Sequence, residues 1–106
     1  KNLINIGGKK VNPKEVEDVL LRYPGIHDCV VYKSMRTNDQ EIVKAEIAGE
    51  ALDETEIRTY LRQELAGYKI PSLIEFVSRI ERNSLGKIVK KERYNGESVF
   101  KKLVFI

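Results

Sequence analysis

The chain has one cysteine, one histidine and no tryptophan, and these scarcities exclude several kinds of chemistry. A single cysteine, Cys29, cannot form an internal disulfide, and its apolar neighbours predict a buried structural thiol in a reducing compartment rather than a nucleophile. His27 and Cys29 alone do not make a ligand set, so no metal site is expected. A single histidine also gives no support to a Ser-His-Asp or Cys-His catalytic arrangement.

Long apolar runs are missing as well. None is long enough for a bilayer-spanning helix, which needs about 20 apolar residues, and no signal-peptide pattern opens the chain, so we expect a cytoplasmic protein. A phosphate-binding loop of the GxxxxGK[ST] type is absent too, because Lys87 is followed by Ile88 and Gly86 lacks its partner glycine. The chain alone therefore shows no complete active site.

The 106 residues are enough for one domain, and 42% hydrophobic with 33% charged residues is typical of a globular protein. The net charge of +3 is unevenly placed: residues 82–102 hold seven basic residues against two acidic ones, which is +5 and leaves −2 elsewhere. A basic tail can attract nucleic acid, phosphorylated ligands or an acidic protein surface, or can simply aid solubility. Because the chain begins at Lys1 and its only methionine is Met35, we expect it to have been cut from something larger.

Apolar periodicity predicts strands at residues 3–6, 29–32, 43–47 and 74–80, and helices at residues 13–23 and 54–66. Each helix opens with an N-cap and a glutamate three residues later, namely Asn12 with Glu15 and Asp53 with Glu56. The resulting order, β-α-β-β-α-β, predicts an α+β fold in which two helices pack on one face of a small, mostly antiparallel sheet. Beyond it, residues 88–94 are expected to form a short helix at the start of a charged tail.

Two loops that carry glycine and lysine remain as candidates for chemistry. Residues 7–13 read Gly-Gly-Lys-Lys-Val-Asn-Pro, and residues 82–88 read Arg-Asn-Ser-Leu-Gly-Lys-Ile. Glycine lets the backbone approach a ligand closely, and the neighbouring lysine is a flexible charge suited to a phosphate or carboxylate. Singly, the first loop would be read as a hairpin turn and the second as a strand exit.

Together, the two loops form part of a longer pattern. It runs Gly8-x-x-Val11-x-Pro13-x-Glu15-Val16-Glu17 and then Pro71…Phe76-Val77…Ile80-x-Arg82-Asn83-Ser84-Leu85-Gly86-Lys87-Ile88. This pattern resembles the C-terminal domain of the adenylate-forming superfamily, which includes acyl-CoA synthetases, peptide-synthetase adenylation domains and firefly luciferase. The resemblance implies that residues 1–93 form a lid domain, followed by an extra tail at residues 94–106.

The resemblance further implies an ATP-dependent, AMP-forming ligase that joins an acid to a thiol. A large N-terminal adenylation domain, expected to precede this chain, binds ATP, Mg²⁺ and the carboxylic acid. The lid first presents Lys87, supported by Gly86 and Ser84, to the carboxylate and the α-phosphate, and acyl-AMP and pyrophosphate form. It then turns about a hinge at Lys1.

After that turn, the resemblance implies that a second loop faces the active site and admits CoA or the phosphopantetheine arm of a carrier protein. This thiol-access loop consists of Gly7, Gly8, Lys9 and Lys10. Some relatives carry a lysine at position 5 that assists this half-reaction, a role that Asn5 does not supply. The chain by itself is expected to be catalytically inert and to bind ATP poorly. The identity of the acid is not readable, because the acyl pocket belongs to the large domain.

The same element order also describes ferredoxin-like modules, including RNA-binding domains, and a free-standing interaction module is a further alternative. A basic tail would suit RNA. However, no predicted strand carries the aromatic cluster with which such domains stack bases, so nucleic acid is not the expected partner.

Overall fold

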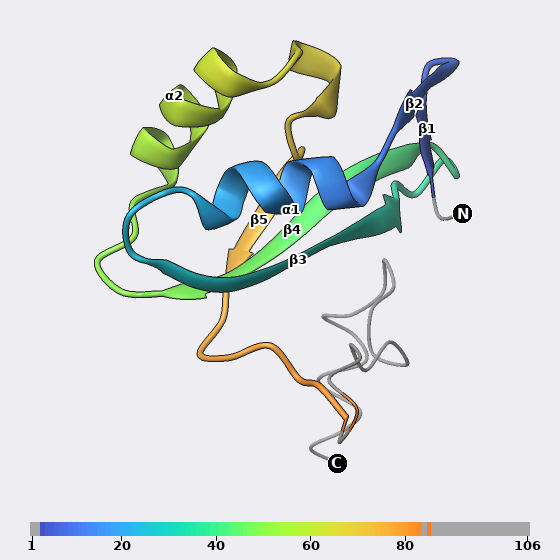
Figure 1. Ribbon diagram of the computed structural model, residues 1–106. Coiled ribbons are helices and arrows are strands. Elements are labelled where there is room, and N and C mark those ends of the chain that lie inside the picture. Colours follow the sequence, from blue (N-terminus) through green and yellow to red (C-terminus); the bar gives the residue numbers. More distant parts are fainter. Residues whose placement is uncertain (1–2, 84, 86–106) are drawn as a thin grey trace.

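The computed structural model describes residues 3–83 and 85, and Figure 1 shows how their elements are arranged. In chain order these elements are β1 (Ile4–Ile6), β2 (Lys9–Val11), α1 (Pro13–Leu21), β3 (Ile26–Met35), β4 (Glu41–Gly49), α2 (Glu54–Glu64), the 3-10 helix η1 (Gly67–Lys69) and β5 (Leu73–Phe76). β1 and β2 pair as an antiparallel hairpin, and β3, β4 and β5 form a second sheet in that order. Within it, β3 and β4 are antiparallel whereas β4 and β5 are parallel. The expected α+β class with two helices and mostly antiparallel strands is therefore confirmed.

Both helices start where the sequence predicts, because a side chain caps each of them. Asn12 Oδ1 accepts the backbone N–H of Lys14 (3.0 Å), and Asp53 Oδ1 accepts that of Glu56 (3.2 Å). Each cap satisfies one of the backbone donors that a helix leaves unpaired in its first turn. Pro13 begins α1, at a position where its missing N–H costs nothing.

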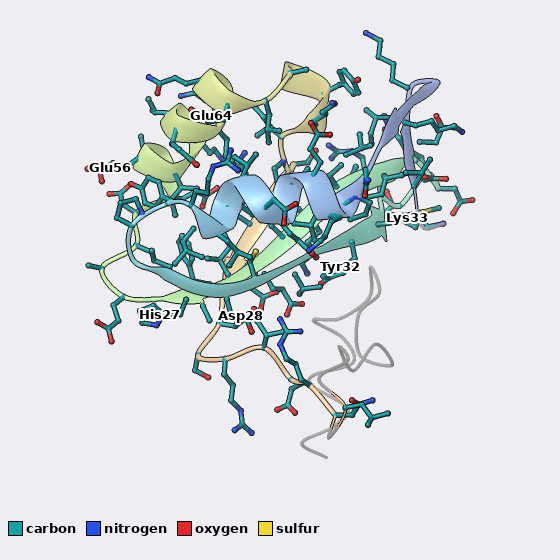
Figure 2. All side chains as sticks on the ribbon, viewed as in Figure 1. His27, Asp28, Tyr32, Lys33, Glu56 and Glu64 are labelled. Atoms are coloured by element: carbon teal, nitrogen blue, oxygen red, sulfur yellow. The ribbon has the colours of Figure 1, made fainter. Side chains whose placement is uncertain are left out.

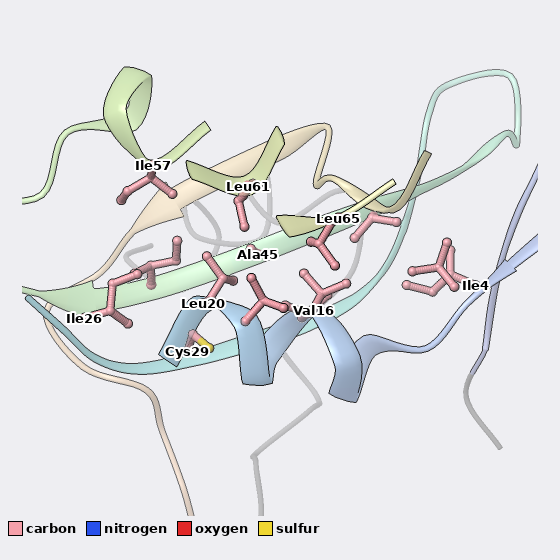
Figure 3. Packing of buried hydrophobic residues seen from close by; sticks show 14 residues of the cluster. Ile4, Val16, Leu20, Ile26, Cys29, Ala45, Ile57, Leu61 and Leu65 are labelled. Carbon is pink, nitrogen blue, oxygen red and sulfur yellow. The ribbon is translucent and has the colours of Figure 1, made fainter. Parts of the chain in front are cut away.

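The main hydrophobic core lies between the two helices and one face of the second sheet (Figure 3). α1 contributes Val16 and Leu20, α2 contributes Ile57 and Leu61, and all four are fully buried. Ala45 of β4 faces them from the sheet. Burial of each large aliphatic side chain stabilises the fold by about 1.5–3 kcal/mol. This cluster therefore holds the helices on the sheet and fixes the ends of the elements from which the loops emerge.

The face of the second sheet away from the helices carries a smaller cluster and buried polar groups. Val30 and Ala48 pack there against Ile80, which belongs to the segment after β5. Beside them, the hydroxyl of Tyr32 donates a hydrogen bond to Glu46 Oε2 (2.6 Å). After β5 the chain thus crosses to the side of the sheet opposite the helices (Figure 1).

The structure differs from the sequence-based prediction in the first and the last strand. The first strand has a hairpin partner, Lys9–Val11, which periodicity does not reveal because two lysines leave it a single apolar residue. The last strand ends at Phe76 instead of continuing to Ile80, because Ile80 packs into the smaller cluster. The helix expected at residues 88–94 and the tail at 94–106 lie outside the described residues. No helix in the described part of the chain is long and apolar enough to cross a membrane.

Candidate functional site

The first candidate loop is a two-residue turn at the tip of the β1–β2 hairpin. Ile6 pairs with Lys9 across it, and Gly7 and Gly8 have φ angles of 59° and 90°. Positive φ at both central positions is typical of a type I′ hairpin turn, which glycine adopts without strain. A Cβ atom on either glycine would meet nothing within 4 Å. The outer side of the turn is therefore open to an approaching ligand.

Two hydrogen bonds and two buried side chains hold this hairpin in place. Asn5 Oδ1 accepts the N–H of Gly8 (2.9 Å), and the N–H of Asn5 donates to Glu41 Oε1 at the start of β4 (2.8 Å). At the base of the hairpin, the paired residues Ile4 and Val11 are fully buried in the main core. Asn5 therefore serves the turn itself, and the turn has a fixed place relative to the core.

Beside the turn, one aromatic ring lies close to two lysines. Lys9 Nζ is 4.9 Å and Lys69 Nζ is 5.8 Å from the centroid of the Tyr68 ring, which is within reach of cation–π attraction. Lys69 also donates to both carboxylate oxygens of Glu15, at 3.0 and 3.1 Å, and this hydrogen bonding raises the pKa of Lys69. We call Lys9, Tyr68 and Lys69 the basic aromatic patch.

The sequence indicates Lys9 and Lys10 as residues of a candidate loop, but it does not indicate that Tyr68 and Lys69 lie beside that loop. Lys9 lies on the same side of β2 as Val11, because residues two apart on a strand point to the same face, and η1 packs against β2. Lys10 points to the other side and is exposed. The only sequence signal for this pair is an aromatic residue followed by a lysine, Tyr68-Lys69, shortly after α2. Its approach to β2 is a tertiary contact that periodicity does not encode.

The second candidate loop is reached through a segment that is anchored repeatedly. The N–H of Val77 donates to the carbonyl oxygen of Ile47 (2.9 Å), and Ile80 is then buried against the sheet. Arg82 makes two hydrogen bonds to one carboxylate, from Nε to Asp28 Oδ2 (3.1 Å) and from Nη2 to Asp28 Oδ1 (2.6 Å). Hydrogen bonding to Asp28 raises the pKa of Arg82. Figure 2 shows Asp28 on the side of β3 that faces this segment.

Asn83 initiates the last described turn, because its Oδ1 accepts the N–H of Leu85 (2.9 Å) in the manner of an Asx-turn. The residues to which the resemblance assigns the catalytic loop and the hinge lie outside the described residues: Ser84, Gly86, Lys87 and Lys1. The structure thus places Gly7, Gly8, Lys9 and Lys10, to which the resemblance assigns thiol access, at the tip and along one strand of the β1–β2 hairpin. For the lysine loop it describes the approach and not Lys87 itself.

The lone cysteine is buried on β3, as the sequence predicts. Cys29 is 4% exposed, and burial raises the pKa of its thiol to about 12, with the carboxylates of Glu17 and Asp28 adding to the effect. A thiol of this kind is not a nucleophile near neutral pH. The Glu17 carboxylate accepts the N–H of Val31 (2.8 Å), and burial raises the pKa of Glu17. His27 is exposed, and no three potential metal ligands cluster among residues 3–83 and 85.

Known proteins resemble this chain over most of its length. It matches the model of the AMP-binding enzyme C-terminal domain over residues 15–87. It is 38% identical over 96 residues to a 3,4-dihydroxybenzoate–[aryl-carrier protein] ligase of Bacillus anthracis, covering 91% of this chain and 23% of that protein. It is also 38% identical over 95 residues to a feruloyl-CoA synthase of an Amycolatopsis species, covering 87% of this chain and 19% of that protein. The chain thus spans roughly a fifth of the length of these relatives.

Solved structures give the same picture. A fatty acyl CoA synthetase of Mycobacterium tuberculosis superposes with a TM-score of 0.78 at 30% identity, covering 96% of this chain and 19% of the other. An o-succinylbenzoate CoA synthetase of Bacillus subtilis, in complex with its acyl-adenylate intermediate, superposes with a TM-score of 0.78 at 28% identity. That match covers 86% of this chain and 19% of the other.

Proposed function

Because this chain belongs to the family of AMP-binding enzyme C-terminal domains, we propose that it is the lid of an ATP-dependent, AMP-forming ligase that joins a carboxylic acid to a thiol. The observation that carries the proposal is the family match, which begins within α1 and ends on Lys87. The names of two relatives support a thiol acceptor, since one specifies a carrier protein and the other CoA. The rest of the active site then belongs to an N-terminal adenylation domain. We also propose a cytoplasmic location, in keeping with the unpaired, buried Cys29.

In the first half-reaction, Lys87 acts as a catalytic residue. An oxygen of the substrate carboxylate attacks the α-phosphorus of ATP, the bond from that phosphorus to the bridging oxygen breaks, and acyl-AMP and pyrophosphate form. Two anions must meet in this step, so an ammonium group beside them stabilises the charge that the transition state shares. Gly86 and Ser84 support the loop that presents it. We assign Mg²⁺ to the adenylation domain together with ATP, because Mg²⁺ is usually held by substrate phosphates and one or two carboxylates beside them.

In the second half-reaction, the lid turns about Lys1 and the β1–β2 hairpin takes the place of the lysine loop. The thiol attacks the acyl carbon of acyl-AMP, a thioester forms and AMP leaves. The open turn at Gly7 and Gly8 supports this role, because a backbone without Cβ atoms lets a thin pantetheine arm pass close by. Lys9 and Lys10 add cations that suit the phosphates of CoA, and the Tyr68 ring beside Lys9 adds apolar surface that suits its base.

The proposal is tested in the complete ligase, meaning this chain together with its adenylation domain. Lys87→Ala is expected to slow adenylate formation, measured by pyrophosphate exchange, by about 10²–10³-fold, as for the loss of one electrostatic contact to a transition state. Thioester formation from supplied acyl-AMP should largely survive. Gly8→Ala, which places a Cβ on a residue with a φ of 90°, should slow the thioester step and spare adenylation.

Gly67→Ala is the matched control for the glycine variant. A Cβ at Gly67 also meets nothing within 4 Å, but its φ is outside the left-handed region, so both rates should stay at the wild-type level. Equal losses in both half-reactions for Lys87→Ala would contradict the two-position mechanism. Failure of the complete protein to form any acyl-AMP from a broad set of carboxylic acids would contradict the ligase itself.

A further inference from the structure

The ion pair between Asp28 and Arg82 joins the segment after β5 to the start of β3. We propose that Asp28 and Arg82 are positioning residues for the adenylation half-reaction, because their pair fixes where and in which direction the chain enters the lysine loop. The inference rests on the proposed function of Lys87. It assigns a role in the reaction to Asp28, which lies in neither glycine-lysine loop, and to Arg82, the first residue of the second loop.

The geometry of this pair distinguishes it from the other ion pair of the same segment. Arg82 presents two nitrogens to the two oxygens of Asp28, at 3.1 and 2.6 Å, and its partner lies 54 residues away in sequence. Arg79 makes one contact of 3.4 Å to Glu81, two residues away, and these side chains are 78% and 53% exposed. The side chains of Arg82 and Asp28 are 37% and 32% exposed. A fork with two contacts restricts direction as well as distance, so of these two ion pairs the Arg82 pair is the one suited to orient the segment.

Asp28 is itself held firmly, which makes it a suitable anchor. The register of β3 against β4 shifts between Ile26 and Asp28, a bulge of the kind that re-aims a side chain. Asp28 Oδ1 also accepts the N–H of the next residue, Cys29, at 2.8 Å. The carboxylate is therefore tied to the backbone of the strand on one side and to Arg82 on the other.

The length of chain between the anchors and Lys87 shows how large a loss of adenylation rate would indicate that the ion pair orients the lysine loop. Arg82 precedes Lys87 by five residues, and Ile80, whose side chain is buried against the sheet, precedes it by seven. Even if the chain were released completely at Arg82, the reach to Lys87 would grow only from about 17 Å to about 24 Å, at about 3.5 Å per extended residue. Because effective concentration falls as the −3/2 power of tether length, this lengthening alone costs less than about twofold in rate. A much larger loss requires that the pair also sets the direction of the chain.

The experiment measures both half-reactions of the complete ligase in matched variants. Asp28→Asn keeps an oxygen for the N–H of Cys29 and removes the charge, and Arg82→Lys keeps the charge and removes the fork. Each is expected to slow adenylate formation at least tenfold, while thioester formation from supplied acyl-AMP stays within about twofold of wild type. Arg79→Ala is the control in the same segment and should change neither rate. Thermal unfolding of each variant identifies any that fails to fold, and the other variant then carries the test.

The outcomes separate this inference from the proposed function. A loss of adenylation smaller than tenfold in the folded variants, or an equal loss in both half-reactions, would overturn the positioning role and leave the pair as a stabilising contact. If Lys87→Ala collapses adenylation in the same assay, the proposed function stands whatever the pair does. If Lys87→Ala leaves adenylation intact, the proposed function itself fails, and the inference fails with it.

Discussion

The close backbone approach between Gly25 and Gly49 gives a sharp test of how this fold is packed. Gly49 is the last residue of β4 and lies beside Gly25, which precedes β3. A Cβ on Gly49 would lie 2.0 Å from the carbonyl oxygen of Gly25 and 3.0 Å from the Cα of Ile26. That carbonyl oxygen also accepts the N–H of Glu50 (2.9 Å). The φ of Gly49 is outside the left-handed region, so Gly49→Ala acts through the collision alone.

The size of the effect of Gly49→Ala follows from these distances. A carbon and an oxygen that are not bonded rest about 3.3 Å apart or more, so the two backbones must separate by over about 1 Å. Overpacking of this kind costs about 1–3 kcal/mol, and loss of the hydrogen bond from Glu50 adds about 1 kcal/mol. We therefore expect the free energy of unfolding to fall by about 2–4 kcal/mol, which corresponds to roughly 10–25 °C in Tm for a chain of this size.

Thermal and urea unfolding of the 106-residue chain, followed by circular dichroism, measure this change. Gly67→Ala is the control, because its Cβ meets nothing within 4 Å and its stability should stay within about 0.5 kcal/mol of wild type. If Gly49→Ala unfolds within about 1 kcal/mol of wild type at an unchanged m-value, the reasoning is refuted. Asp28 follows Gly25 by three residues, so a folded Gly49→Ala chain should also hold Arg82 less well.

Two further predictions concern groups with shifted pKa values. At pH 8, a thiol with a pKa of 9.0 is about one-tenth thiolate, whereas the Cys29 thiol, with a pKa of about 12, is about 10⁻⁴ thiolate. Cys29 in the folded chain should therefore react with iodoacetamide about a thousandfold more slowly than in the chain unfolded in urea. A rate difference below tenfold would contradict the burial of Cys29. Burial raises the pKa of Glu17 in the folded chain above 4.5. The protonated side chain therefore contributes to the free energy of unfolding fully below pH 4.5, and this contribution is lost as the pH rises through the pKa of Glu17 in the folded chain. Glu17→Gln keeps an acceptor for Val31 and should be more stable than wild type in urea at pH 7, with the difference vanishing near pH 4; an equal difference at both pH values would argue against the raised pKa.

Local chemistry made the helices predictable. Asn12 and Asp53 cap their helices through the side-chain oxygens that the sequence indicates, and the apolar residues at helical spacing, such as Val16 and Leu20, are the ones that are buried. These features depend on neighbours within a few residues, and a sequence displays them directly. The two-glycine turn was likewise visible as a turn signal, and the structure confirms it with positive φ at Gly7 and Gly8.

Features that join distant parts of the chain were not predictable in the same way. β2 exists because it pairs with β1, although its own composition is dominated by lysine. Tyr68 follows α2 in the sequence and yet contacts Lys9 of β2, and Arg82 binds Asp28, which is 54 residues away in sequence. No periodicity encodes such approaches, because they arise when the whole core has formed. The approach to the lysine loop therefore needed the structure, whereas Lys87 as the candidate came from the sequence pattern.

The side-chain bonds along the outer edge of β3 have a consequence for how the chain behaves in solution. The N–H of Val31 donates to Glu17 and that of Cys29 donates to Asp28, so carboxylates occupy two successive donors on the side of the strand away from β4. An edge strand with unoccupied donors can recruit a strand from another molecule and so begin aggregation. Here an incoming strand would first have to displace two carboxylates. These two carboxylates thereby guard the chain against self-association along this edge.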